Sequence, residues 1–572
     1  MFPLPRSTGG EGIRFPNPPN PRIIGGMSVA VTLPLTSAAT VKRRDWASVV
    51  ALTLACAIFA GLSAFLAVKS ESDLEADATT HFLIARFALR EHHYIVSVWG
   101  RPLCTLAYAF VAWIGTVEQG RLAARMSSLA LALVVVAVTY LIGKRQGYRK
   151  PALVAIFLLA QPIFFLHSFS QLTEIPFAVV LMLAFLAFQR KRWLAMAVLT
   201  GLLPLGRPEG FGFILMAAAV LLVYRARWLW VLAVPFLIWN YAGWYITAGH
   251  AFHWWNRIFN REWYGWVFRN WPYAYRSMYG RGRLISFVGR LPILVSPLLF
   301  PFCMAGIVLG LRWIPWHGRL ARVFQPRTWA RRPCHELTHE QRCEIWIALI
   351  PLSILAVHSI LWWQGLMGSN GELRYLVIVG PFFALMTARG WEWAWPKLGW
   401  THPLLWAGVA SLLPLTANCF YRVVPLGIYA DGNVARQVSR WYQSNREIQK
   451  DFPRIMPTPS EIPFLMDLSQ SDSDRMLPVC KMNVNHPPAG ALLVWDPING
   501  LYNSAEDMCV PKELIEKAGW LHYRHFQEED RYCDVYLSPT TISGENSHLR
   551  YKGDWEGMSP ELRLDLLKRF QN

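Results

Sequence analysis

The feature that most constrains this chain is a series of long apolar segments between Trp46 and Phe420. The first, Trp46 to Val68, is long enough to cross a bilayer as a helix, because a span needs about 20 apolar residues. It follows the basic residues Lys42 to Arg44, which the positive-inside rule places in the cytoplasm. We therefore expect a polytopic α-helical membrane protein, in the cell inner or plasma membrane, with a cytoplasmic N-terminus.

Basic loops set the expected topology. The segments KRQGYRK (Lys144 to Lys150), QRKR (Gln189 to Arg192) and RAR (Arg225 to Arg227) alternate with less basic turns, so each should lie in the cytoplasm. Threading the chain through the membrane on this basis predicts about eleven transmembrane helices and an outer C-terminus. The predicted spans are 46–68, 121–142, 151–169, 174–188, 193–206, 211–224, 228–246, 291–311, 345–363, 376–388 and 403–420.

Composition divides the chain into three parts. Residues 1–44 are rich in Pro, Gly and Ser and cannot bury a core, so they are predicted to be a disordered cytoplasmic tail. Residues 45–420 form the transmembrane domain, with outer loops at 69–120 and 248–290. In residues 421–572 the segments ALLVWDP and RYCDVYLSP have strand composition, and KELIEKAGW is typical of a short helix ending at Gly519. This last part is predicted to be a small extracytoplasmic α/β domain.

The net charge does not indicate a nucleic-acid partner. Lys and Arg exceed Asp and Glu by 56 − 37 = 19 residues. Membrane proteins collect such an excess in their cytoplasmic loops, so the basic balance is explained without nucleic acid.

A polar segment, Glu71 to Pro102, directly follows the first span and carries Glu75, Asp77 and His81. We interpret Asp77 as a catalytic carboxylate, with Glu75 as the alternative. The competing interpretation is a solvated acid in a loop, because carboxylates are common in loops.

Other charged residues fall on the same predicted outer side. They are Glu174 in TEIPF, Arg207 and Glu209 in RPEG, and Glu372 and Arg374 in ELRY, which also contains the polar Tyr375. Charged residues at the ends of spans usually face a cavity or a pathway rather than lipid, so these positions suggest one common site. Each also has a structural alternative: helix capping for Glu174, a simple turn for RPEG, and a surface ion pair for Glu372 and Arg374.

The loop from His250 to Arg290 combines seven Arg with five Trp on the side where basic residues should be scarce. Its arginines include Arg257 and Arg261. Guanidinium groups bind phosphate in a bidentate manner and Trp favours the headgroup level, so this composition fits a lipid that carries phosphate. The alternative is an aromatic belt that rests on membrane lipid.

These motifs resemble the GT-C glycosyltransferase superfamily, whose members include protein O-mannosyltransferases and the aminoarabinose transferase acting on lipid A. The resemblance lies in EADATTHFLIAR (Glu75 to Arg86), GRPL (Gly100 to Leu103), TEIPF, RPEG and GELRYL (Gly371 to Leu376), within roughly residues 45–420. It implies an enzyme that transfers a sugar, with inversion, from a polyprenyl phosphate or pyrophosphate. The acceptor is a hydroxyl or amine outside the cytoplasm, on a glycan, a lipid or a protein.

The resemblance also implies roles for individual residues. Asp77 or Glu75 would accept the proton of the acceptor. The residues expected to bind substrate are His81, Arg101, Glu174, Arg207, Glu209, Arg257, Arg261, Glu372, Arg374 and Tyr375. No metal ligand is assigned, and a divalent metal cofactor is left open.

Three alternatives come from other classes of protein. The segment HELTH, His335 to His339, matches the HExxH pattern of zinc proteases, but it lies in a predicted cytoplasmic loop without a third ligand, which favours the start of a helix. A transporter or lipid flippase would also have many spans and polar helix ends, although no internal repeat is visible. A noncatalytic binding subunit would retain the same fold.

Overall fold

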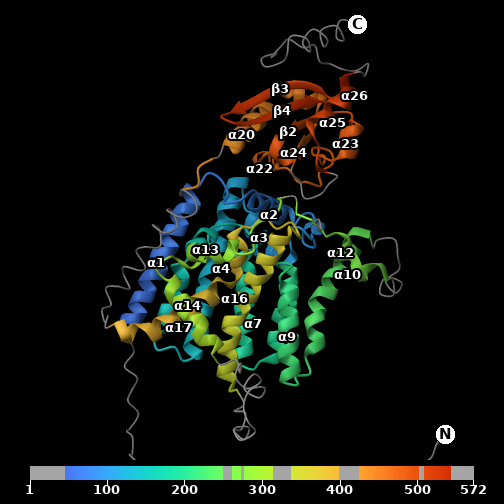
Figure 1. Ribbon diagram of the computed structural model, residues 1–572. Coiled ribbons are helices and arrows are strands. Elements are labelled where there is room, and N and C mark those ends of the chain that lie inside the picture. Colours follow the sequence, from blue (N-terminus) through green and yellow to red (C-terminus); the bar gives the residue numbers. More distant parts are fainter. Residues whose placement is uncertain are drawn as a thin grey trace, which may run out of the picture. The chain divides into compact units, whose positions relative to one another are not determined.

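The computed structural model describes residues 46–248, 261–271, 276–277, 279–312, 337–398, 424–428, 430–501 and 508–542 (Figure 1). The predicted tail and the predicted last span, 403–420, lie outside the described residues. The helical part comprises α1 (Trp46–Lys69), α2 (Ala76–Phe87), α3 (Pro102–Ala112), α4 (Val117–Arg145), α5 (Pro151–Leu159), α6 (Pro162–His167), α7 (Glu174–Gln189), α8 (Trp193–Leu202), α9 (Gly210–Val223), α10 (Val234–Ala248), α12 (Trp266–Arg269), α13 (Ser286–Val295), α14 (Phe300–Leu311), α16 (His339–Gln364) and α17 (Gly380–Leu398), with the 3-10 turns η1 (His92–Tyr94), η2 (Leu203–Leu205), η3 (Leu229–Ala233), η5 (Arg261–Gly265) and η7 (Leu373–Val379).

Five helical segments of the described chain are long and apolar enough to cross a membrane. They are Trp46–Lys69, Val117–Arg145, Leu229–Thr247, His339–Gln364 and Leu373–Trp395. A sixth candidate, α13 with α14, is bent by 112°, and four further apolar helices are shorter, including α7 and α9. The predicted count of about eleven spans is therefore not confirmed, although helices occupy nearly all of the predicted segments that are described.

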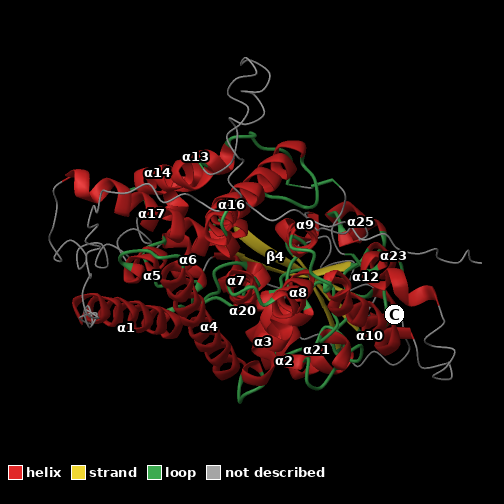
Figure 2. Cartoon of the chain, turned by 90° about the horizontal axis from the view of Figure 1, so that it is seen from below, coloured by secondary structure: helices red, strands yellow, loops and turns green. Residues whose placement is uncertain are grey.

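Apolar side chains cover the outside of these helices. Leu215 and Leu222 of α9, Ile238 of α10 and Val308 of α14 are each more than half exposed. Such side chains in water would cost free energy, whereas hydrocarbon tails solvate them. The protein is an integral membrane protein, and Figure 2 shows its helices α1, α4 and α5 side by side.

The segment 69–120, predicted as an outer loop, contains two helices. α2 begins just after Glu75 and places Asp77 in its first turn, and α3 begins at Pro102, where a proline ring is compatible with the first helical turn. The sequence analysis missed both helices because each is too short to resemble a span. The segment between the first two candidate spans therefore contains short helices, and α2 holds Asp77 in a fixed position.

A buried arginine on α4 holds the start of α2 against the end of α1. The guanidinium of Arg125 donates to the carbonyl oxygens of Ala67 (2.8 Å), Ser70 (2.8 Å) and Ser72 (2.6 Å). It also donates to Oδ1 of Asp73 at 2.7 Å, and both side chains are almost fully buried. Oδ2 of Asp73 accepts from Thr79 of α2 at 3.0 Å. One cation therefore joins three helices and satisfies carbonyl groups that the helix end leaves without partners.

The C-terminal part contains a four-stranded sheet with strand order β1-β2-β4-β3. β1 pairs parallel with β2, and the other two pairs are antiparallel. Its elements are α20 (Ala430–Ser444), α21 (Arg446–Asp451), β1 (Arg454–Pro457), α22 (Glu461–Leu465), α23 (Lys481–Asn485), β2 (Ala491–Trp495), α24 (Pro497–Leu501), α25 (Lys512–Lys517), β3 (Leu521–Glu528), β4 (Arg531–Leu537) and α26 (Pro539–Ile542). The strands expected in ALLVWDP and RYCDVYLSP, and the short helix before Gly519, are present.

We predict that Arg125→Ala strongly destabilises the purified protein. The substitution leaves the Asp73 carboxylate buried without its cation, and breaking a buried pair in this way typically costs about 3–5 kcal/mol. Thermal unfolding in detergent, followed by size-exclusion chromatography, should show a midpoint several degrees below that of the wild type. Arg145→Ala, at the exposed end of the same helix, is the control and should leave the midpoint unchanged. Equal midpoints for the two variants would contradict this role of Arg125.

Candidate functional site

Most of the predicted polar residues lie around one cavity of about 420 Å³. It lies between the first turn of α2, the start of α7, the turn before α9, the middle of α16 and the turn η7. Of the residues proposed from the sequence, it is lined by Asp77, His81, Arg101, Glu174, Arg207, Glu209, Arg374 and Tyr375. Segments separated by some 300 residues thus supply one site, as the expected common side of their spans suggested.

Asp77 is held by an arginine from the far end of the helical part. Nη2 of Arg374 donates to Oδ2 of Asp77 at 2.6 Å, while Nε of Arg374 pairs with Glu372. Oδ1 of Asp77 has no hydrogen-bond partner among the described residues, and about a third of the side chain is exposed. The carboxylate is therefore fixed through one oxygen and presents the other to the cavity.

Burial and neighbouring charges act in opposite directions on the two carboxyl groups beside Arg374. Burial alone would raise the pKa of Asp77, but Arg374 and His81 together hold it below its usual range. For Glu372, burial raises the pKa to about 7; Arg374 opposes this shift, while Glu75 and Asp77 add to it. Asp77 is accordingly ionised at neutral pH, whereas Glu372 titrates close to neutrality.

Glu372 lies behind Arg374 and is not among the residues that line the cavity. Its carboxylate accepts from the Asn370 side chain, and Asn370 in turn accepts from the hydroxyl of Tyr375 at 2.5 Å. This residue was predicted to bind substrate. The structure instead places it where it can position Arg374.

Arg207 is surrounded by two acids. Nη1 donates to Oε1 of Glu174 at 2.6 Å and to the Thr173 hydroxyl at 2.8 Å, and Nη2 donates to Oε1 of Glu209 at 2.9 Å. The Glu174 side chain is only 1% exposed, so its charge requires this partner. His358 of α16 lies 3.2 Å from the same oxygen of Glu209. The capping interpretation of Glu174 is incomplete, because its carboxylate also forms this tertiary ion pair.

The GRPL segment and α2 add aromatic contacts. The His81 ring stacks on Trp99, with 5.7 Å between their centroids, and burial lowers the pKa of His81 to about 4, so the imidazole is neutral at pH 7. Arg101 has a φ of +65°, in the left-handed region that costs a non-glycine residue free energy. Its guanidinium lies 5.8 Å from the centre of the Trp271 ring.

Part of the arginine-rich loop lines the cavity. Arg257 and the side chain of Arg261 lie outside the described residues, so their predicted roles stay predictions. Arg276 and Tyr279 line the cavity, and among the described residues Arg276 has no carboxylate partner. Trp266 is buried and donates to the Thr247 hydroxyl at 2.9 Å, so it is part of the core rather than of a lipid-facing belt.

Glu75, the alternative to Asp77, does not line the cavity that contains Asp77. It immediately precedes α2 and lines a different cavity, together with Glu71, Asp73 and Arg121. Of the two carboxylates that the sequence offered as the base, Asp77 lines the cavity that contains Arg207 and Arg374, whereas Glu75 does not.

Among the lining residues that the sequence analysis did not propose are Thr173, His358 and Asn370. His358 carried a usable signal, because an ionisable side chain inside an apolar span usually faces a cavity. Thr173 and Asn370 carried none, since uncharged polar residues beside helix ends are common.

The HELTH segment does not provide a metal site at His339. α16 begins at this residue, after the capping residue Thr338, whose hydroxyl accepts from the Gln341 amide. Both ring nitrogens of His339 are engaged: Nδ1 with the Tyr224 hydroxyl at 2.8 Å and Nε2 with the Gln189 carbonyl at 3.2 Å. A metal at either nitrogen would have to displace the contact that this nitrogen makes. His335 lies outside the described residues.

The fold and the cavity define a polytopic membrane protein with a site built from paired arginines and carboxylates. No protein-family model matches the sequence, and no curated protein matches it significantly. The structure is similar to apo ArnT from Cupriavidus metallidurans, with 13% identity, a TM-score of 0.53, and coverage of 86% of this chain and 99% of that chain. This similarity gives the chain a GT-C-like fold.

Two further solved structures match with lower TM-scores. ArnT from Cupriavidus metallidurans bound to undecaprenyl phosphate has 12% identity and a TM-score of 0.47, covering 86% of this chain and 98% of that chain. The Archaeoglobus fulgidus oligosaccharyltransferase tethered with an acceptor peptide has 11% identity and a TM-score of 0.44, covering 86% and 74% respectively.

We predict that Arg207 is needed for the stability of the site. Arg207→Ala leaves Glu174 and Glu209 as neighbouring unpaired acids in a buried place, which should cost about 3–5 kcal/mol and lower the thermal midpoint by several degrees. Arg207→Lys should restore only part of the loss, because an ammonium group cannot bind both carboxylates as a planar fork does. The exposed Arg283, changed to Ala, is the matched control. A midpoint for Arg207→Ala equal to that of the control would show that this ion-pair cluster contributes nothing to stability.

Proposed function

We propose that this protein is a glycosyltransferase that moves a sugar from a polyprenyl-phosphate or pyrophosphate donor to an acceptor hydroxyl or amine, with inversion, at the cavity containing Asp77. The observation that carries the proposal is the pairing of Asp77 with Arg374. It sets an ionised carboxylate with one unpaired oxygen beside guanidinium groups, in a chain with a GT-C-like fold.

The lining of the cavity fits the two ends of a lipid-linked donor. Its basic residues include Arg101, Arg276 and Arg374. Its apolar residues include Met216 of α9 and Ile354, Val357 and Leu361 of α16. A phosphate suits the basic residues, because guanidinium groups bind phosphate through charge-assisted hydrogen bonds. A prenyl chain suits the apolar residues, because burying apolar surface is favourable.

The reaction assigns a task to each oxygen of Asp77. Oδ1 accepts the proton of the acceptor hydroxyl or amine as that atom attacks the anomeric carbon. The bond between the anomeric carbon and the phosphate oxygen breaks, and the phosphate leaves with the electron pair. The proton ends on Asp77, while Arg374 holds Oδ2 and keeps the carboxylate aimed at the cavity.

The arginines divide into those that bind phosphate and those that organise the site. Arg207 is occupied by Glu174 and Glu209, so we assign it a positioning role. Arg276 has no such partner among the described residues, and we assign it to the donor phosphate together with Arg374. Charge that grows on the leaving phosphate is then met by donors already in place.

The surroundings of the reaction follow from the expected topology. We place the site outside the cytoplasm, since the basic loops 144–150, 189–192 and 225–227 lie at the opposite ends of the spans in the sequence. The proposal covers acceptors on a glycan, a lipid or a protein, and it allows a divalent metal at the donor phosphate.

We predict that Asp77→Asn lowers transfer from a polyprenyl-phosphate sugar by about 10²- to 10⁴-fold, the usual loss when a general base is removed. Donor binding should persist, because the amide leaves Arg276 and the apolar side of the cavity intact. Transfer is measured with purified protein in lipid nanodiscs and a radiolabelled donor.

The matched control for this experiment is Glu75→Gln, one residue before the same helix. It should retain nearly wild-type transfer, because Glu75 lines a different cavity. An active Asp77→Asn enzyme, or an inactive Glu75→Gln enzyme beside it, would overturn the assignment of the base.

We also predict that donor affinity falls as pH rises through about 7, the pKa of Glu372. Below that pH Glu372 is neutral and Arg374 offers its full charge to the phosphate; above it, the Glu372 anion partly cancels that charge. A sugar phosphodiester is the appropriate ligand, since its own charge does not change in this range.

The pH experiment compares wild type, Glu372→Gln and the exposed-site control Glu118→Gln by donor binding at about pH 6 and about pH 8, on either side of that pKa. Glu372→Gln should bind the donor at both pH values with the affinity that the wild type has at about pH 6. The control should bind more weakly at about pH 8 than at about pH 6, as the wild type does. Retention of the full pH dependence in Glu372→Gln would show that another group causes it.

A further inference from the structure

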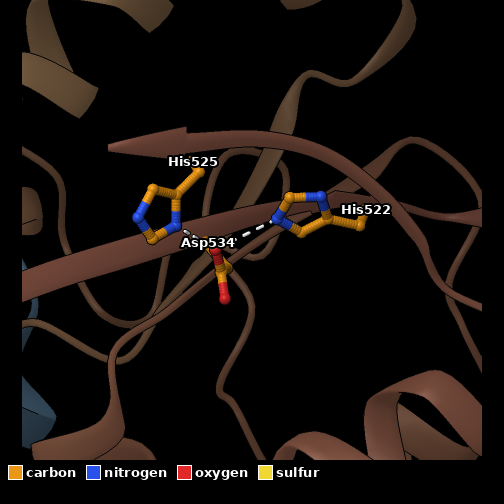
Figure 3. A group of neighbouring side chains, drawn as sticks. All are labelled: His522, His525 and Asp534. Carbon is orange, nitrogen blue, oxygen red and sulfur yellow. Dashed lines mark hydrogen bonds and ion pairs between the residues drawn. The ribbon is translucent and has the colours of Figure 1, made fainter. Parts of the chain in front are cut away.

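The hairpin β3–β4 of the C-terminal sheet gathers two histidines and an aspartate outside the site described above. Asp534 is 1% exposed, and its Oδ1 lies 3.0 Å from Nε2 of His522 and 2.7 Å from Nδ1 of His525. Figure 3 shows the two imidazole rings on either side of the carboxylate. The rings are about a quarter and a third exposed, so solvent reaches the group.

A β-bulge brings both histidines to the same face. Side chains three positions apart on a regular strand point to opposite faces. Here the pairing shifts between His522 and Arg524, so that Tyr523 is the extra residue. His522 is then opposite Tyr536 and His525 opposite Asp534, two positions that share one face of β4. Bulges of this kind often redirect side chains at functional sites.

Gln527 orients the ring of His525 with Nδ1 toward Asp534. Its Nε2 lies 3.3 Å from Oε1 of Gln527, and the Gln527 amide is oriented by its own donation to the Glu529 carbonyl at 3.0 Å. The 2.7 Å contact between Nδ1 and Oδ1 of Asp534 is a hydrogen bond that Nδ1–H donates, and a metal ion between these atoms would take the place of that proton. Nε2–H faces Gln527, so this nitrogen is left to the outer partner when Nδ1 binds the ion.

The ligand set itself fits a first-row divalent ion. Two imidazoles and one carboxylate are common zinc ligands, and an outer partner on the second ring nitrogen is typical of metal-bound histidine. The three ligand atoms lie within 4.8 Å of one another, so small side-chain rotations reach the separation of about 3.3 Å that tetrahedral zinc requires. Lys512 binds the other oxygen, Oδ2, at 2.9 Å and leaves Oδ1 directed toward the histidines.

We propose that His522, His525 and Asp534 bind a zinc-like divalent transition metal through Nε2, Nδ1 and Oδ1, with water completing the coordination. The site is separate from the residues proposed for sugar transfer. Gln527 is a positioning residue, because it holds the ring of His525 without reaching the metal.

The test uses the full-length protein purified in detergent through a tag that contains no histidine. After incubation with zinc and removal of the excess, metal content is measured by mass spectrometry, and zinc affinity by calorimetry. Wild type should retain one zinc equivalent more than the variant carrying both His522→Ala and His525→Ala. His486→Ala, an exposed histidine of the same domain, is the control and should retain the wild-type content.

Two further measurements keep the test decisive if the double variant unfolds. Gln527→Ala, an exposed position, should fold normally and bind zinc about 10- to 100-fold more weakly. Cobalt bound to the wild type should give visible absorption bands that His525→Ala loses. Equal zinc content in wild type and the double variant, or an unchanged affinity in Gln527→Ala, would show a hydrogen-bonded network that takes no metal.

Discussion

The ion pair between Arg125 and Asp73 is the constraint on which the position of the site depends. Asp73 lies four residues before Asp77, and its carboxylate is fixed both by Arg125 of α4 and by Thr79 in the first turns of α2. The same guanidinium binds the last carbonyls of α1. Two carboxylates of the acid-rich segment after the first span therefore have different roles. Asp73 fixes the start of α2, and Asp77 lines the cavity.

Charge pairing continues into the cavity in two groups. Arg207 neutralises Glu174 and Glu209, and Arg374 lies between Asp77 and Glu372. Buried charges persist only when they are paired, and the pairs Arg207–Glu174 and Arg374–Asp77 join segments far apart in sequence. The cavity is consequently preorganised: its guanidinium and carboxylate groups are already in place before a substrate arrives. Such preorganisation is what electrostatic catalysis requires.

The sequence predicted much of this arrangement and failed at identifiable points. Apolar length and basic loops located most helices between α1 and α17, and placing Asp77, Glu174, Arg207 and Arg374 on one side anticipated their convergence. The helices α2 and α3 were missed because short helices that pack under other segments lack the length that marks a span. The bend between α13 and α14, beside Ser296 with a φ of +91°, was hidden because one continuous apolar run covers both.

The roles of neighbouring acids could not be separated from sequence for a physical reason. Glu75, Asp77 and Glu372 differ in which cavity they face and in what lies behind them, and both depend on long-range packing. The bulge at Tyr523 is a similar case, since one extra residue changes the face that His522 occupies without any local signal. The sequence therefore identifies the ionisable side chains, whereas long-range packing determines which of them lie together.

The most direct test of the central claim is turnover of a lipid-linked sugar by the purified protein. Polyprenyl-phosphate sugars labelled in the sugar are supplied one at a time in nanodiscs, together with a mixture of cell-envelope acceptors, and the free polyprenyl phosphate and labelled product are quantified. Our account predicts that at least one donor is consumed, with equal amounts of polyprenyl phosphate and glycosylated product. If every donor remains intact while the protein moves labelled lipid between the leaflets of a vesicle, the account is contradicted and the cavity belongs to a transporter.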